Sequence, residues 1–476
     1  MTARYWCELA WLGGPRVEPG VVIEVEGDRI AGVAAGVRTR PEDAVPLAGL
    51  TLPALANAHS HAFHRALRGR THCGRGNFWT WRDLMYRVAA RLDPDNYYRL
   101  ARAVFAEMVL TGIGVVGEFH YVHHRPGGDS YDDPNAMGAA VVAAARDAGV
   151  RLTLLDTLYL HGGLDTGSTR GHNQRTPDPT HGYSPRTPGL ASGYSPLRPE
   201  QARFSDGSAE RWAKRVDGLA SAVSGPAVRV GAAVHSVRAV DPASIKVAVE
   251  WARDGDAPLH FHASEQPAEN EQCLAVHGRT PVEVIAQAGG LGPGTTLVHA
   301  THVTEHDLAL IGEAGAHCCF CPTTEHDLAD GVGPAEALAR TGARLCVGSD
   351  SHAVIDLFEE VRVVELDQRA ASGGRGVFGV EELAAMATVA GYRSLGWPDG
   401  GTLEAGALAD FATVGLDSVR LAGIDDDSTL AAVVFAATAA DVRHLVVGGR
   451  AIVRGGAHTS INAAPELRAA IREVVS

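Results

Sequence analysis

Histidines spaced two apart are the residues of this chain best suited to bind a metal ion. His59 and His61 lie in the segment Asn57-Ala-His-Ser-His61, and His260 and His262 repeat the spacing. On an extended strand, residues two apart point to the same side, so both imidazoles can reach one ion. The chain has 22 histidines, so such pairs also arise by chance. A histidine that is merely buried in the core is the alternative interpretation.

Two further candidate ligands follow apolar runs. His299 ends one run, and Asp350 follows another within Gly-Ser-Asp-Ser-His. Three imidazoles and a carboxylate are a suitable ligand set for Zn²⁺ or Fe²⁺. Each residue alone is also compatible with a core histidine or a helix-capping aspartate. Their shared position at the ends of predicted strands favours a metal site.

Short apolar runs alternate with longer amphipathic segments, and this pattern predicts the elements that position the candidates. The predicted strands are 51–56, 113–119, 151–157, 228–234, 257–262, 295–299, 316–321 and 343–348, with helices at 97–110, 135–148, 242–253, 281–288 and 305–314. Eight strands separated by helices favour a (β/α)₈ barrel, whose functional residues sit at the C-terminal strand ends. A doubly wound sheet is the alternative, but no GxGxxG or Walker A sequence follows an early strand.

The two ends of the chain differ from this pattern. They contain short strand candidates at 21–26, 29–32, 409–414, 444–447 and 451–454, the last two joined by a Gly448-Gly449 turn. Neither end can make a core alone. We therefore predict one small β-sandwich from residues 1–50 and 402–458, beside a barrel of residues 51–401 and a final helix within 459–476.

A segment rich in Gly, Pro, Ser, Thr and Arg interrupts the predicted barrel at 161–199. Loops of this length are usually either functional lids or flexible insertions. Because the segment follows the third predicted strand, it would overhang the active face. Both interpretations stay open.

Composition excludes several classes of protein. The chain has 42 Lys and Arg against 56 Asp and Glu, a net charge of −14, which argues against a nucleic-acid or acidic-membrane binder. No signal peptide and no run of 18 apolar residues is present, so we expect a soluble cytoplasmic protein. Seven unevenly spaced cysteines fit a reducing compartment. Cys318, Cys319 and Cys321 lack a second pair to complete a soft-metal cage, which favours small residues on a buried strand.

The arrangement of HxH, two later histidines and an aspartate at strand ends resembles the amidohydrolase superfamily. The segment 401–410 resembles the point where that family's chain returns to its sandwich. Longer blocks are similar to the formimidoylglutamate deiminases, at 59–66, 78–87, 118–124, 235–240, 262–266 and 321–325. The resemblance covers the chain except 161–199. It implies hydrolysis of N-formimidoyl-L-glutamate to N-formyl-L-glutamate and ammonia, a step of histidine degradation.

The resemblance also implies a ligand set and an order of proton transfers. It assigns one divalent ion, zinc in preference to iron, to His59, His61, His262 and Asp350. Lys214 and Lys246 fall in predicted helices, so no carboxylated lysine can bridge two metals. Glu265, three residues after His262, favours His262 over His260 as a ligand, and it would protonate the imine nitrogen. Asp350 and His299 would accept or orient the proton of water.

The blocks that match also supply the expected substrate contacts. These are His64, Arg82, Tyr121, His235 and Arg238. Arginine suits a small dicarboxylate substrate because its planar fork pairs with carboxylates. His64 stands where the family commonly has Gln, and both side chains can donate a hydrogen bond to a carboxylate.

The sequence leaves two alternative functions open. The first rival is an aminohydrolase of a purine or another nitrogen heterocycle, and the second is a non-catalytic metal-binding protein. By analogy with such barrels, we expect a homodimer with no nucleic-acid or membrane partner.

Overall fold

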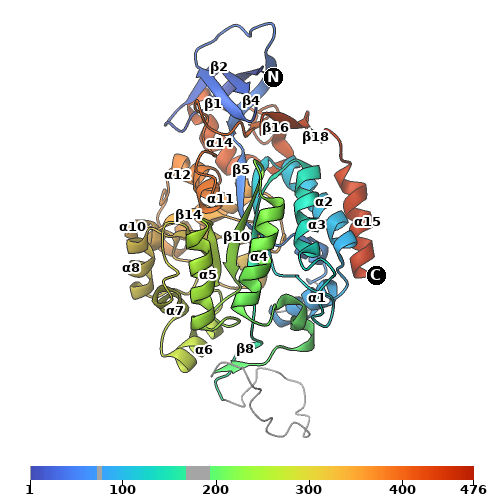
Figure 1. Cartoon of the computed structure of the whole chain (residues 1–476). Helices are drawn as coiled ribbons and strands as arrows, with labels where there is room; N and C mark the ends of the chain where they lie inside the picture. The colour runs from blue at the N-terminus through green and yellow to red at the C-terminus, as the bar shows by residue number, and fades with distance from the viewer. Residues whose placement is uncertain (1, 72–77, 168–192) are drawn as a thin grey trace.

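The computed structural model describes residues 2–71, 78–167 and 193–476, and two sheets of eight strands dominate it (Figure 1). One sheet is the predicted (β/α)₈ barrel. Its parallel strands are β5 (Leu55–Ser60), β6 (Ile113–His120), β7 (Arg151–Leu158), β10 (Val228–Val234), β11 (Leu259–Ala263), β12 (Thr295–His299), β13 (His317–Phe320) and β14 (Arg344–Val347). A parallel bridge between Ser60 and Asp350 joins the first strand to the last. The barrel therefore closes at two segments that carry predicted ligands.

Helices surround the barrel, and their ends follow local sequence signals. They are α1 (Phe78–Ala89), α2 (Pro94–Leu110), α3 (Ala136–Ala148), α4 (Ala209–Val223), α5 (Pro242–Asp254), α6 (Pro267–His277), α7 (Pro281–Gln287), α8 (Glu305–Ala314), α9 (Pro322–Leu328), α10 (Ala335–Thr341), α11 (Leu357–Ser372), α12 (Val380–Met386) and α13 (Val389–Ser394). Asp93 caps α2 with a capping box, and Pro94 occupies the first turn, where no N–H is needed. Gly149 ends α3 in the left-handed conformation (φ 75°) that glycine adopts without strain.

The second sheet is built from both ends of the chain and forms the predicted sandwich. Its strands are β1 (Thr2–Trp11), β2 (Val17–Glu26), β3 (Arg29–Ala34), β4 (Val45–Pro53), β15 (Phe411–Val414), β16 (Val442–Val447), β17 (Arg450–Arg454) and β18 (Ala457–His458). β4 pairs with β15, so the N-terminal strands continue directly into the C-terminal ones. The boundaries 1–50, 402–458 and 51–401 remain our prediction for how the chain divides into domains.

One predicted barrel strand requires correction. Residues 51–53 of the predicted strand 51–56 belong to β4 in the second sheet, and the barrel begins at Leu55. Only Ala54 separates the two strands, and the residues on both sides are buried. Because the apolar run is continuous, the sequence does not indicate where β4 of the second sheet ends and β5 of the barrel begins.

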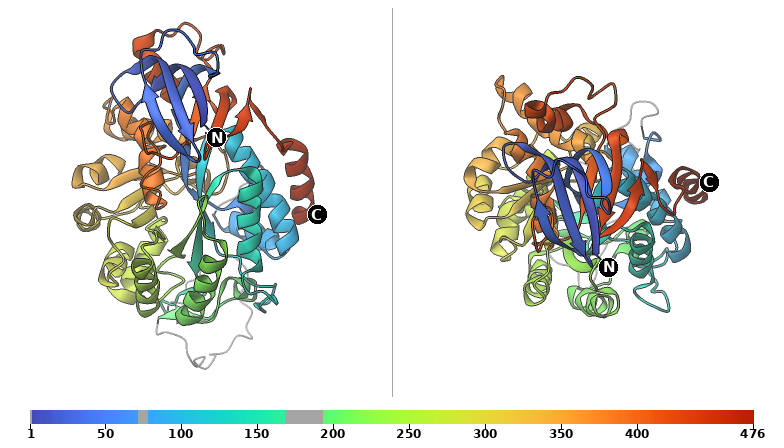
Figure 2. Two further views of the ribbon diagram at one scale, coloured as in Figure 1. Left: turned by 45° about the horizontal axis from the view of Figure 1, so that its top comes forward. Right: turned by 90° about the horizontal axis from the view of Figure 1, so that it is seen from above.

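The second sheet lies across the N-terminal ends of the barrel strands (Figure 2). Buried Asp410 joins the two parts, because its carboxylate accepts hydrogen bonds from the Arg151 side chain at 2.6 and 3.2 Å. The Tyr392 hydroxyl and the Gly448 N–H donate to the same carboxylate at 3.1 and 2.7 Å. Arg151 begins β7, so this joint is at the barrel end opposite the predicted site.

The final helix α15 (Ala463–Val475) runs along the outside of α2, where Arg99 pairs with Glu473 at 2.5 Å. None of the helices in the described ranges has both the length and the apolar character needed to cross a membrane. The question of a lid falls largely on residues 168–192, which lie outside the described residues. The ordered pair β8 (Gly163–Leu164) and β9 (Tyr194–Ser195) flanks them.

Candidate active site

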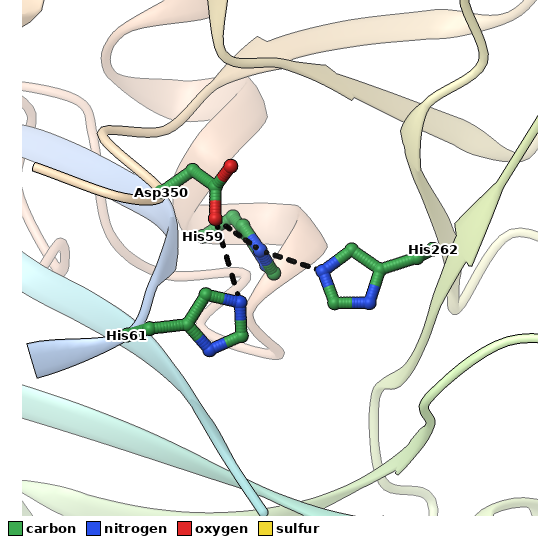
Figure 3. Close-up of side chains that lie close together, drawn as sticks. All are labelled: His59, His61, His262 and Asp350. Atoms are coloured by element: carbon green, nitrogen blue, oxygen red, sulfur yellow. Dashed lines mark hydrogen bonds and ion pairs between the residues drawn. The ribbon is translucent and has the colours of Figure 1, made fainter. Parts of the chain in front are cut away.

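Four predicted ligands converge at the C-terminal end of the barrel (Figure 3). The Nε2 atoms of His59 and His61 lie 3.3 and 3.4 Å from Asp350 Oδ1. The Nε2 atom of His262 lies 3.1 Å from Nε2 of His59. One ligand atom from each residue falls within 4.8 Å of all the others, and all four residues are buried. The structure thus brings together side chains from β5 and the residue that follows it, from β11 and from the segment after β14.

The protonation of these side chains fits a bound cation. His61 and His262 donate through Nδ1 to the carbonyl oxygens of Phe119 and His235, each at 2.9 Å. Their Nε2 atoms then carry lone pairs, which is the tautomer that binds a metal ion. Burial lowers the pKa of His61 to about 3, and burial also lowers the pKa of His59 and His262 well below the usual value. Converging lone pairs repel one another, so a divalent cation among them fits this donor set.

The backbone around the cluster is shaped for close approach. A Cβ atom added to Gly348 would lie 2.7 Å from both the N and the O of His59. Only glycine therefore allows the backbone after β14 to lie this close to the backbone of His59. Asp350 and His299 themselves adopt φ angles of 38° and 72°, which non-glycine residues rarely do. Such conformations cost energy and concentrate at functional sites.

A group suited to move protons lies beside the cluster. Glu265 Oε1 is 3.9 Å from His299 Nε2, and His299 Nε2 is also 3.9 Å from Asp350 Oδ2. On its other side, His299 Nδ1 contacts Glu325 Oε1 at 3.1 Å. Burial alone would lower the pKa of His299, but the hydrogen bond to Glu325 and the charges of Glu265 and Asp350 raise it to about 10.

His260 stays outside the cluster, as expected from the sequence. Its Nε2 atom contacts the carbonyl oxygen of Ser394 at 3.0 Å, and it is fully buried. Another cluster of His120, His123 and Asp156 has metal-ligand spacing. Its carboxylate, however, already binds both terminal nitrogens of Arg215 at 2.9 and 2.8 Å. A cation there would compete with that guanidinium, so we interpret this cluster as a structural network.

The five predicted substrate contacts line one cavity of about 370 Å³ together with three of the four proposed ligands, His61, His262 and Asp350. They are His64, Arg82, Tyr121, His235 and Arg238. His64 Nε2 lies 2.9 Å from the Tyr121 hydroxyl. Arg238 lies 3.4 Å from Glu265 and 3.6 Å from Glu269. The cavity therefore combines a metal-binding end, a carboxylate suited to proton transfer and fixed positive charge.

Three residues at the site were not predicted from the sequence. Glu325 holds His299, and Glu118 accepts hydrogen bonds from the Ser60 hydroxyl and the Ala62 N–H, each at 2.6 Å, beside the first two ligands. Both glutamates occur in blocks that carry the family resemblance, which was the available signal. Arg198 also lines the cavity, but it falls in the stretch predicted to be an insertion.

Comparisons with known proteins agree with this geometry. The sequence profile of the amidohydrolase family matches residues 50–452. A formimidoylglutamate deiminase of Pseudomonas aeruginosa is 34% identical over 92% of both chains. A 5-methylthioadenosine/S-adenosylhomocysteine deaminase of Natronomonas pharaonis is 28% identical over 92% of this chain and 86% of its own. The crystal structure of an amidohydrolase from Brucella melitensis superposes with a TM-score of 0.87 at 30% identity, covering both chains completely. These matches confirm the resemblance on which the sequence analysis relied.

Proposed function

The chain belongs to the amidohydrolase family, whose members hydrolyse carbon–nitrogen bonds, and from that premise we propose that it converts N-formimidoyl-L-glutamate to N-formyl-L-glutamate and ammonia. One observation carries the proposal. A single cavity is lined by three of the proposed ligands, by Glu265 and by the two arginines Arg82 and Arg238. A dicarboxylate substrate requires such fixed positive charge beside the reacting group.

His59, His61, His262 and Asp350 would hold one divalent ion, which we propose is zinc. When bound, the ion supplies Lewis acidity, which lets water lose a proton near neutral pH. The second carboxylate oxygen of Asp350 would accept that proton, and His299, whose pKa is raised to about 10, would orient the water as a donor. The Nε2 atom of His299 lies 3.9 Å from Oδ2 of Asp350, so both groups face the same place beside the ligand cluster.

Glu265 would protonate the imine nitrogen of the substrate. Protonation makes the formimidoyl carbon more electrophilic, and water adds to it to form a tetrahedral intermediate. The proton that Asp350 took from water would then pass to the amine nitrogen, and the carbon–nitrogen bond breaks to release ammonia. The hydroxyl group of the intermediate returns a proton to Glu265 as it becomes the formyl oxygen. Arg238, 3.4 Å from Glu265, is placed to hold the carboxylate nearest the reacting carbon.

The test of the reaction measures ammonia release from N-formimidoyl-L-glutamate by protein whose metal content is known. Glu265→Gln should lower kcat by about 10²–10⁴-fold, the usual contribution of a general acid, with metal content unchanged. Glu271→Gln, an exposed glutamate on α6, is the matched control and should keep full activity. Equal activity of both variants would remove Glu265 from the mechanism.

Adenosine, guanine and 5-methylthioadenosine should be assayed in parallel. Aromatic side chains also line the cavity, among them Trp81, Tyr86 and Tyr159. They are the one feature that favours the rival reaction on a heterocycle. Turnover of a heterocycle alone would replace our substrate, and no turnover with metal bound would favour a non-catalytic protein.

We further propose that the enzyme serves histidine degradation in the cytoplasm and acts as a homodimer. The resemblance to the formimidoylglutamate deiminases supports the first proposal, and the analogy with related barrels supports the second. Light scattering of the purified protein tests the assembly, because a single-chain mass would contradict it.

A further inference from the structure

His352 is a fully buried histidine that the proposed reaction does not use, and it stands two residues after Asp350. Its Nδ1 atom lies 3.0 Å from the Ser349 hydroxyl, and its Nε2 atom lies 3.2 Å from the Ser60 hydroxyl. Ser349 comes directly before Asp350, and Ser60 stands between the first two ligands. The ring of His352 therefore connects the two segments that carry three of the four proposed ligands.

The hydrogen bonds continue beyond both serines. Buried Asn57 donates through Nδ2 to the Ser349 hydroxyl oxygen at 2.7 Å, and its Oδ1 atom accepts from the Ser349 N–H at 2.9 Å. At the other end, the Ser60 hydroxyl donates to Oε2 of buried Glu118 at 2.6 Å. The bonds thus leave β5 at Asn57, cross to the segment after β14 and return to β5 at Ser60. Together these side chains form a junction network of Asn57, Ser349, His352, Ser60 and Glu118.

The donors and acceptors of the junction network fit one arrangement of protons. The Ser60 hydroxyl donates its one hydrogen to Glu118, so it can only accept from His352. The Nε2 atom of His352 then carries the ring proton, and Nδ1 of the neutral ring accepts from the Ser349 hydroxyl. Each hydroxyl group thus donates one hydrogen bond and accepts another. Buried hydrogen bonds ordered in this way strengthen one another.

The junction network holds a strained turn. Asp350 and His352 adopt φ angles of 38° and 58°, and such conformations persist only where surrounding contacts fix them. The His352 N–H donates to the Ser349 carbonyl oxygen at 2.8 Å, and Nε of Arg68 donates to the His352 carbonyl oxygen at 2.7 Å. From this turn, Asp350 directs Oδ1 to the first two ligands at 3.3 and 3.4 Å and Oδ2 to His299 at 3.9 Å. Relaxation of the turn would therefore move both carboxylate oxygens.

We propose that His352 is a positioning residue that fixes, through the two serines, the direction in which Asp350 presents its carboxylate to the metal ion. This inference rests on the metal site of the proposed function and is independent of the substrate. Without the ring, Asp350 turns away from the first two ligands, which weakens metal binding. The oxygen that accepts the proton of water moves as well, which slows the reaction.

Cobalt(II) is the probe for this role, because its visible absorption spectrum reports the coordination geometry. His352→Leu removes both ring nitrogens and keeps a similar volume. It should raise the Kd for Co²⁺ of chelator-treated protein by about 10–100-fold, the usual effect of losing a partner of a metal ligand, and alter the visible spectrum. With metal saturating, kcat should fall by about 10–100-fold, while KM stays within about threefold because His352 lies outside the cavity lining.

Two milder variants keep the proposal testable if His352→Leu does not fold. His352→Gln retains an amide N–H that can donate to Ser60, so it should recover part of the Co²⁺ affinity and of the wild-type spectrum. Ser60→Ala removes a single oxygen atom from the junction network. It should weaken Co²⁺ binding and change the spectrum in the same direction as His352→Leu.

His260→Leu is the matched control, because His260 is equally buried in the barrel and contacts the carbonyl oxygen of Ser394 outside the junction network. It should keep the wild-type spectrum and Kd for Co²⁺, even where urea unfolding shows lower stability. An unchanged spectrum and Kd in His352→Leu, or in Ser60→Ala if the first does not fold, would overturn the proposal. The same change in His260→Leu would also overturn it.

Failure of the proposed function gives a different result. If the wild-type protein releases no ammonia but binds Co²⁺ with a spectrum that depends on His352, the substrate is wrong and the positioning role stands. A wild-type protein that binds no Co²⁺ would refute the metal site and the positioning role together.

Discussion

At the scale of single residues, two histidines on one strand show that distance from the C-terminal strand end determines whether a histidine can be a metal ligand. His260 and His262 have the same spacing as His59 and His61, and both point into the barrel. His262 is at the strand end and meets His59 at 3.1 Å. His260 comes two residues earlier on β11 and therefore lies farther from the strand end. Its Nε2 atom contacts the carbonyl oxygen of Ser394. The same residue type is thus a proposed ligand in one place and a core residue in the other.

Removing each histidine should therefore have a different effect. His262→Ala should lower metal affinity by more than about 100-fold, because even partners of metal ligands contribute 10–100-fold. His260→Ala should keep the metal but lower the free energy of unfolding, since it leaves a buried carbonyl without its donor. Metal content after dialysis against a chelator, together with urea unfolding, measures both effects. Equal metal retention in the two variants would contradict the proposed ligand set.

At the scale of elements, the contact between β5 and β14 positions the proposed ligands. Gly348 lets the backbone pass His59, and the Ser349 and Asp350 N–H groups donate to the His59 carbonyl oxygen at 3.1 and 3.0 Å. This bond pattern aligns a ligand from the first strand with one that follows the last. The contact that closes the barrel is therefore also the contact that positions these two ligands.

Gly348→Ala should separate these two strands. The added methyl group would meet backbone atoms, which cannot rotate away, so we expect a loss of about 1–3 kcal/mol in the free energy of unfolding. Metal affinity should fall with it. Gly292→Ala is the control, because its added Cβ would meet nothing within 4 Å. Normal metal binding by Gly348→Ala would show that the contact does not set the site's geometry.

The attachment of α4 to β7 gives a prediction about pH. Asp156 on β7 accepts hydrogen bonds from Arg215 and, at 3.0 Å, from Trp212 Nε1, both on α4. Burial would raise the pKa of Asp156, but Arg215 lowers it below the usual value. A lowered folded-state pKa stabilises the protein above the unfolded pKa of about 4, and that stability is lost as the pH falls below it.

Arg215→Met should therefore lower the free energy of unfolding by about 3–5 kcal/mol at pH 7, because it leaves a buried charge unpaired. The difference from wild type should shrink as the pH falls below about 4 and Asp156 becomes protonated. Urea unfolding over the same fall in pH measures it. Arg211→Met, an exposed substitution on the same helix, should have no such pH dependence. A difference that is constant with pH would mean that the pair is not responsible.

At the scale of the whole molecule, Asp410 joins the second sheet to the barrel at the end away from the proposed site. Asp410→Asn should lower the free energy of unfolding by about 3–5 kcal/mol, since Arg151 would lose its buried counter-charge. The kcat of the remaining folded enzyme should not change. Asp417→Asn, whose partner Arg443 is 3.3 Å away at the surface, is the matched control. A lower kcat in Asp410→Asn would indicate coupling between the joint and the site.

The barrel and the proposed ligands were predictable because their signals are local. Strand periodicity located β10 and β12, and the ligand candidates stand at strand ends. The passage from β4 to β5 was not predictable, because no polar residue marks it. Arg198 was not predicted to line the cavity, because its position depends on Gln201, which joins its segment to the distant Tyr86 and Tyr159 by hydrogen bonds. Contacts of that kind leave no periodic pattern in a sequence.

The pairing of β4 with β15 has a consequence for how the protein is made. β4 ends at Pro53, and β15 begins only at Phe411. The ribosome must therefore translate the whole barrel segment before β15 can pair with β4. At about 5–20 residues per second, this delay lasts on the order of tens of seconds to a minute. Throughout that time β4 presents an unpaired edge, the kind of surface that chaperones shield from aggregation.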